Sequence, residues 1–143
     1  NRTAEMKRTG GFLIVFDVDD FKKVNDVYGH LKGDVCLSEI ASCIKKAYAN
    51  YGYCYRIGGD EFCVLLKNTE QKDQCLQVFL KLLEERRSEF DFIPNVSFGS
   101  STFSGEDILT IKDRADQDMY RFKKARKENT LIQMQNSNAC EKE

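Results

Sequence analysis

The residues of this chain best suited to chemistry are two acidic stretches, Asp17–Asp20 and Asp60–Glu61. Asp17 and Asp19 point the same way if the preceding strand continues through them. If the second stretch lies beside that strand, three or four carboxylates converge at one edge of a sheet. Such a cluster repels itself unless a divalent cation joins it, and hard oxygen ligands favour Mg²⁺, which often completes its shell with substrate phosphates. Solvated acids in loops are the alternative interpretation.

Glycines and lysines accompany these acids. Gly58 and Gly59 directly precede the second acidic stretch, where they allow the backbone to come close to a ligand. Lys22 follows the first stretch, and Lys123 and Lys127 are four residues apart, which places both on one face of a helix. Lysines beside a metal site would balance the charge of a triphosphate. Each feature also has an ordinary explanation, namely a hairpin turn for the glycines and a solvated basic helix end for the lysines.

The elements that must position these residues alternate between strands and helices. Runs of β-branched and aromatic residues predict strands at 11–17, 51–57, 62–66, 95–103 and 130–134. Apolar residues at helical spacing predict helices at 20–28, 34–48, 70–90 and 108–127. The order is therefore β-α-α-β-β-α-β-α-β. The second and third strands form a hairpin, because a short glycine turn joins them. The pattern therefore predicts an antiparallel or mixed sheet with helices packed on it.

The composition is that of one globular domain. The chain has 143 residues, of which 41% are apolar and 31% charged, with a formal net charge of −1. A balanced charge argues against a protein that coats nucleic acid, and the longest apolar run, Phe12–Phe16, is too short to span a bilayer. The six cysteines lack zinc-site spacing, so we expect reduced, buried side chains. The chain starts without Met, which suggests a fragment of a longer protein.

Taken together, these residues resemble the signature of the GGDEF family of diguanylate cyclase domains. Residues 56–62 read R-I-G-G-D-E-F. Residues 16–26 (F-D-V-D-D-F-K-K-V-N-D) and 29–34 (G-H-L-K-G-D) resemble the family's D-x-D-x-F-K-x-x-N-D and G-H-x-x-G-D. Downstream, S-F-G at 97–99 resembles its S-x-G strand, and residues 115–123 resemble its last helix. The resemblance extends from residue 1, where N-R is similar to the end of the family's opening segment, to about residue 133.

The resemblance implies an α+β fold, an α/β sandwich with a palm-like, nucleotide-cyclase-like central five-stranded mixed sheet flanked by helices. It implies a GGDEF domain over residues 1–134, with a truncated N-terminal segment, and a disordered tail over 135–143. The implied reaction condenses two GTP molecules into cyclic di-GMP and releases two pyrophosphates, in a homodimer that holds both substrates for attack. A catalytically inactive GTP-binding module that signals to a neighbouring domain is the alternative.

The resemblance also assigns roles to individual residues. Asp17, Asp60, Glu61 and the Val18 carbonyl would bind Mg²⁺, with Mn²⁺ as a substitute. Asp60 and Lys22 would act in catalysis, Asp60 either as a base or by placing the metal that acidifies the 3′-hydroxyl. The substrate-binding residues would be Asn25, His30, Asp34, Gly58, Gly59, Lys123 and Lys127.

Guanine would be read by Asn25 and Asp34, since a carboxylate accepts from the N1–H and the exocyclic amine of guanine. The setting implied is bacterial second-messenger signalling in the cytoplasm, under an N-terminal sensory or regulatory domain that is missing here. We expect this domain to contact neither nucleic acid nor membrane directly, which leaves open a membrane anchor elsewhere in the full-length protein.

Two departures from the family pattern qualify these expectations. The family's K-x-x-G-R-N becomes K-K-A-R-K-E, with Arg126 in place of Gly and Lys127 in place of Arg. Lysine keeps the charge but loses the bidentate fork on phosphate, which Arg126 would have to supply instead. The family's R-x-x-D product-binding motif corresponds here to Ala49–Gly52, which reads A-N-Y-G. Both charged residues of the motif are absent, so we predict no feedback inhibition by product at that position.

Overall fold

Four strands form one antiparallel sheet in the order β2-β3-β1-β4 in the computed structural model, which describes residues 10–141, and the side chains of residues 10–129. The strands are β1 (Gly11–Val18), β2 (Gly52–Arg56), β3 (Glu61–Leu66) and β4 (Val96–Phe103). β1 pairs with β3 on one side and β4 on the other. As a central strand covered on both faces, it has a continuous apolar run instead of an alternating pattern.

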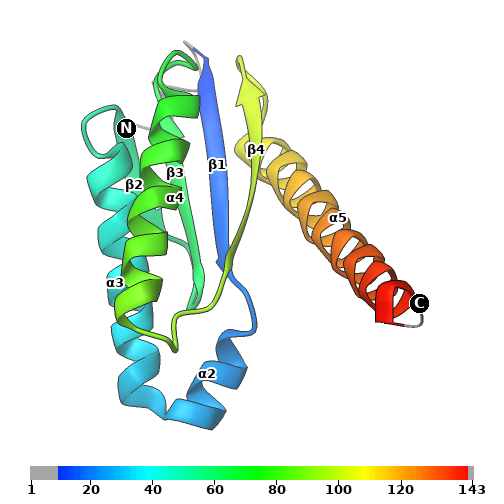
Figure 1. Ribbon diagram of the computed structural model, residues 1–143. Coiled ribbons are helices and arrows are strands. Elements are labelled where there is room, and N and C mark those ends of the chain that lie inside the picture. The colour runs from blue at the N-terminus through cyan, green and yellow to red at the C-terminus, as the bar shows by residue number, and fades with distance from the viewer. Residues whose placement is uncertain (1–9, 142–143) are drawn as a thin grey trace.

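Helices cover both faces of the sheet (Figure 1). α3 (His30–Tyr48) and α4 (Lys72–Glu89) cover one face and α5 (Ile108–Glu141) covers the other, whereas α2 (Phe21–Tyr28) packs against α3 beyond the end of the sheet. The larger core lies between the sheet and α3 and α4, where the Phe16 ring contacts those of Tyr48 and Phe79 at centroid distances of 5.8 and 4.8 Å. A smaller core on the opposite face joins Leu13 and Val15 of β1 to α5. The smaller core thus fixes α5 relative to β1, while the larger core fixes α3 and α4.

The sheet differs from the expectation in one strand. Residues 130–134, predicted as a fifth strand, lie within α5, and every strand pair is antiparallel, so the five-stranded mixed sheet is wrong. No glycine or proline occurs between residues 108 and 141, so nothing in the local sequence ends the helix. α5 also includes residues 135–141 of the segment expected to be disordered. The expectation for the opening N-R lies outside the described residues.

The strand ends meet at one edge of the sheet because β1 runs antiparallel to both of its neighbours. The carboxyl end of β1 therefore lies beside the start of β3 and the start of β4. Val18 N–H donates to the Asp60 carbonyl at 3.1 Å, and Asp19 N–H donates to the Asn95 carbonyl at 2.9 Å. Asp20 then turns the chain into α2 with a φ of 53°, a left-handed conformation that Asp tolerates better than most residues. These bonds fix both acidic stretches at the same edge.

The five cysteines whose side chains the structure describes are free thiols. Cys36, Cys43 and Cys75 are buried, and Cys54 and Cys63 are half-buried. Burial raises the pKa of Cys36 and of Cys63 to about 11, which keeps both thiols protonated at neutral pH. Within residues 10–141, no helix is both long enough and apolar enough to cross a membrane.

Candidate active site

A cleft of about 890 Å³ lies at the sheet edge where β1 ends. Six of the residues singled out in the sequence line it, namely Asp17, Val18, Lys22, Asp60, Lys123 and Lys127. They come from β1, the loop before β3, α2 and α5, so the fold gathers them from positions up to 110 residues apart. The cleft places acidic groups at the strand ends and basic groups on the helices around them.

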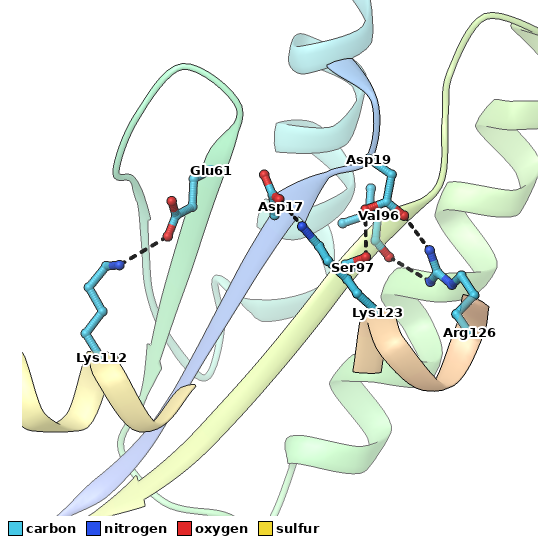
Figure 2. A network of polar contacts seen from close by, with 8 residues as sticks. All are labelled: Asp17, Asp19, Glu61, Val96, Ser97, Lys112, Lys123 and Arg126. Atoms are coloured by element: carbon cyan, nitrogen blue, oxygen red, sulfur yellow. Dashed lines mark hydrogen bonds and ion pairs between the residues drawn. The ribbon is translucent and has the colours of Figure 1, made fainter. Parts of the chain in front are cut away.

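Two carboxylates in this cleft face two cations of α5 (Figure 2). Lys123 Nζ donates to Asp17 Oδ2 at 2.5 Å. Arg126 donates to Asp19 Oδ2 and also contacts the Val96 carbonyl at 3.4 Å. The other Asp19 oxygen accepts a hydrogen bond from Ser97 Oγ at 2.6 Å. Each carboxylate therefore has a cationic partner, which is one of the ways to offset the cost of leaving water.

α5 reaches the cleft because it packs closely against β4. A Cβ atom added to Gly99 would lie 2.2 Å from the backbone nitrogen of Met119 and 2.3 Å from the carbonyl oxygen of Ala115. Only glycine permits so close an approach of the helix to the strand. The Asp118 carboxylate also accepts a hydrogen bond from Ser100 N–H at 2.8 Å. The glycine of the S-F-G stretch thus helps to position Lys123, one helical turn beyond the contact.

Glu61 does not join the other acids. It is paired with Asp17 in the register of β1 and β3, but its carboxylate lies 3.3 Å from Lys112 Nζ of α5 and does not line the cleft (Figure 2). Lys112 also donates to Asp116 at 2.9 Å. The Asp116 hydrogen bond, helped by Glu61, holds the pKa of Lys112 above its usual value. Within the described residues, no three His, Cys, Asp or Glu side chains are grouped closely enough to hold a metal ion.

The glycines of the β2–β3 turn are not explained by the fold itself. Neither Gly58 nor Gly59 has a positive φ, and a Cβ atom added to either would meet nothing within 4 Å. Arg56 fixes their carbonyl oxygens, with Nε donating to Gly58 at 3.0 Å and Nη2 donating to Gly59 at 2.5 Å. The turn is therefore held in place, and the space beside it is open.

The three residues expected to contact the base or its surroundings lie outside this cleft. Asn25 of α2 packs over α3, because a Cβ atom on Gly33 would lie 1.9 Å from Asn25 Oδ1. Asp34 is exposed and lines a second pocket of about 570 Å³, which it shares with Arg56 at the base of the β2–β3 turn. His30 is exposed at the start of α3. The structure therefore does not bring Asn25, His30 or Asp34 against Asp17.

Three cleft residues were missed in the sequence as site residues. Asp19 is expected to point the same way as Asp17 if the strand continues, but the sequence assigns it no role of its own, and it lies in the turn directly after β1. Ser97 belongs to the S-F-G stretch that resembles the family's S-x-G strand, but that pattern assigns it no role in the site. Arg126 is expected from the sequence only as a substitute for the family's phosphate-binding arginine, not as the partner of Asp19. Its partner Asp19 is 107 residues away in the sequence, and only the packing of α5 reveals the pair.

An antiparallel sheet with helices on both faces and an acidic cleft at the end of its central strand defines an α+β domain of the kind found in GGDEF structures. The family model "Diguanylate cyclase, GGDEF domain" matches residues 2–129. The chain belongs to this family.

Individual relatives agree with the family match. The chain is 35% identical to diguanylate cyclase A of Treponema denticola in an alignment 130 positions long, which covers 86% of this chain and 35% of that protein. It is 36% identical to diguanylate cyclase DgcP of Pseudomonas aeruginosa in an alignment 135 positions long, which covers 85% of this chain and 19% of that protein. The chain thus spans about a third or less of the length of these two curated relatives.

Solved structures share the fold. The GGDEF domain of DgcB from Caulobacter crescentus, in complex with c-di-GMP, superposes with a TM-score of 0.71 at 26% identity. The match covers 87% of this chain and 79% of that one. The fold of the described residues is therefore the GGDEF fold.

Proposed function

We propose that this domain is an active diguanylate cyclase, which condenses two GTP molecules into cyclic di-GMP and releases two pyrophosphates. The observation that carries the proposal is the single cleft in which Asp17 and Asp60 face Lys22, Lys123 and Lys127. Acids that attract a divalent cation beside lysines that neutralise phosphates are the parts that phosphoryl transfer requires. The names of the curated relatives support the same reaction.

A divalent cation fits this cleft, and we infer that Asp17, Asp60 and the Val18 carbonyl would hold it. All three donors are hard oxygens, which suit Mg²⁺ and its frequent substitute Mn²⁺. Mg²⁺ usually takes one or two carboxylates and fills its other positions with water and substrate phosphates, so a third carboxylate is not required. Glu61 would join the set only by leaving Lys112. When bound, the ion would polarise the phosphate and make the attacking hydroxyl more acidic.

The substrate would extend from this cleft across the β2–β3 turn. Asp34 lines the second pocket together with Arg56, the residue that holds the turn carbonyls. A GTP molecule that reached both Asp34 and the cleft would pass Gly58 and Gly59, where the space is open. Asn25 and His30 would complete the base end of the site. Close passage of the substrate would explain why glycine occupies positions 58 and 59, where the fold itself does not require it.

Catalysis would need two such domains. Each domain would bind one GTP, and a homodimer would bring the 3′-hydroxyl of one substrate to the α-phosphate of the other. The reaction between two bound substrates would then be effectively unimolecular. Asp60 would serve mainly to place the metal, since a carboxylate on Mg²⁺ is a weak base. Because the chain spans a third or less of its curated relatives, we propose that a sensory or regulatory domain precedes it in a longer protein and controls this pairing in the cytoplasm.

The test is pyrophosphate release from GTP with Mg²⁺ at several protein concentrations, with the product identified by mass. We expect cyclic di-GMP, formed at a rate that rises faster than linearly with protein. Asp60→Asn should reduce the rate at least about 100-fold without a change in the unfolding midpoint, since metal and charge positioning contribute that much or more. Asp91→Asn, at an exposed site away from the cleft, is the matched control and should keep full activity.

One observation favours a second candidate function. Lys123 already pairs with Asp17, and Arg126 stands where the family has Gly, so the chain is consistent with a GTP-binding module that signals without catalysis. Tight GTP binding with no pyrophosphate release at any protein concentration would select this function over the cyclase.

A further inference from the structure

Asp17 and Asp19 are two residues apart but are held very differently. Both oxygens of Asp19 are engaged, one by Ser97 and the other by Arg126. Among the residues that the structure describes, Asp17 has a single polar side-chain partner, Lys123, through one oxygen. The two carboxylates are almost equally exposed, at 23% for Asp17 and 22% for Asp19. The difference therefore lies in the partners, and Asp17 is the carboxylate that is easier to free.

Lys123 can leave Asp17 without releasing α5 from the sheet. Arg126 ties the helix to Asp19 and to the Val96 carbonyl, and its guanidinium lies 4.6 Å from the Phe122 ring centroid. The contact at Gly99 and the bond from Ser100 N–H to Asp118 hold the preceding turns. Lys123 itself has a flexible stem and is 35% exposed, so water can take over its ammonium.

We propose that Lys123 is an exchangeable counter-ion of Asp17. It neutralises Asp17 when no cation is bound, yields Asp17 to a divalent cation, and then moves its ammonium to the phosphates that accompany the cation. The last step rests on the proposed function, whereas the competition for Asp17 does not. Lys123 would then have opposite effects on two affinities. It would weaken binding of the bare cation and strengthen binding of the cation–triphosphate complex.

The experiment measures Mn²⁺ binding, by the electron paramagnetic resonance signal of free Mn²⁺, to the whole chain without nucleotide. Lys123→Met should bind Mn²⁺ about fivefold more tightly, as expected for removal of a partly exposed competing charge. Lys124→Met is the matched control, because it removes the same charge from the next, exposed residue of the helix, and it should change the affinity by less than about twofold.

The second arm repeats the titration with the Mn²⁺ complex of a GTP analogue whose α–β bridge is a methylene group, so that no turnover occurs. Here Lys123→Met should bind about tenfold more weakly, since a phosphate contact is lost. Asp17→Asn checks the location, and it should abolish tight Mn²⁺ binding. Thermal unfolding of each variant shows that the fold is retained.

Three results would overturn the proposal. They are unchanged or weaker Mn²⁺ binding in Lys123→Met, tight Mn²⁺ binding retained in Asp17→Asn, and an unchanged affinity of Lys123→Met for the nucleotide complex. Failure of the proposed function is separate, because it would show as a wild-type chain that makes no cyclic di-GMP. The opposite-sign pattern in that same chain would still support the exchange of Lys123.

Discussion

At the scale of single residues, Arg126 is the side chain that joins the most parts of the site. It contacts Asp19 in the turn after β1, the Val96 carbonyl of β4 and the Phe122 ring on its own helix. The neighbouring Lys123 binds one carboxylate only. An arginine suits the fixed role because its planar fork reaches two acceptors at once and stacks on an aromatic ring, whereas lysine is a mobile point charge. The two cations thus differ in kind as well as in position.

Arg126→Met should therefore lower the free energy of unfolding by about 1 kcal/mol, because Asp19 would keep only its Ser97 partner while half-buried. Urea denaturation measures the change. Arg121→Met is the control. Arg121 is 69% exposed and its ion pair to Asp118 is long at 3.7 Å, so the change in the free energy of unfolding should stay within about 0.5 kcal/mol. Equal losses in both variants would contradict the assigned role of Arg126.

The predicted site residues that line the cleft differ from Glu61, which does not, in what decides the position of their side chains. Asp17 and Asp60 share the cleft because strand order and a short turn put them there, and both can be read locally. The direction of the Glu61 side chain depends instead on Lys112, 51 residues later and on another element. Sequence patterns report which edge of the sheet a residue occupies, but a long-range ion pair decides which way its side chain points.

At the scale of elements, the approach of α5 to β4 determines whether the basic residues reach the cleft. Gly99 is the closest point of this approach, with Ala115 and Met119 backbone atoms where its Cβ would be. The start of α5 was predictable from apolar spacing, and its extent was not. The predicted strand at 130–134 contains β-branched residues, but it follows an unbroken run of helix-compatible residues with no stop signal.

Gly99→Ala should displace α5 and lower the free energy of unfolding by about 1–3 kcal/mol, since two backbone atoms would have to move. Chemical denaturation gives the stability, and affinity for the Mn²⁺–nucleotide complex should fall with it. Gly58→Ala serves as the control for stability, because its added Cβ meets nothing, and its unfolding midpoint should stay the same or rise slightly. A well-folded, fully binding Gly99→Ala protein would show that the approach is not needed.

At the scale of the whole molecule, burial makes folding sensitive to alkaline pH. The pKa of Cys36 and of Cys63 is raised from 9.0 to about 11 by burial, so these thiols keep their protons when the unfolded chain loses them. The raised pKa of Lys112 acts in the same direction at still higher pH. In each case the folded state binds more protons, so stability is fully present below the unfolded pKa and declines as pH rises.

The urea midpoint should therefore fall steadily between pH 9 and pH 11, measured in the presence of reductant. The double variant Cys36→Ala, Cys63→Ala should show a shallower decline, whatever its starting stability. A wild-type midpoint that is constant or rises across this window would contradict the burial of these thiols.

Gly58 and Gly59 carry a consequence for how this chain tolerates change. With negative φ and open space beside them, both positions would accept alanine, and each glycine forgoes about 0.5 kcal/mol of stability by leaving the unfolded chain more freedom. A library of variants selected only for folding would thus drift away from glycine here. A library selected for activity would retain glycine at both positions. Positions at which the two selections differ would therefore identify the surface that the substrate contacts.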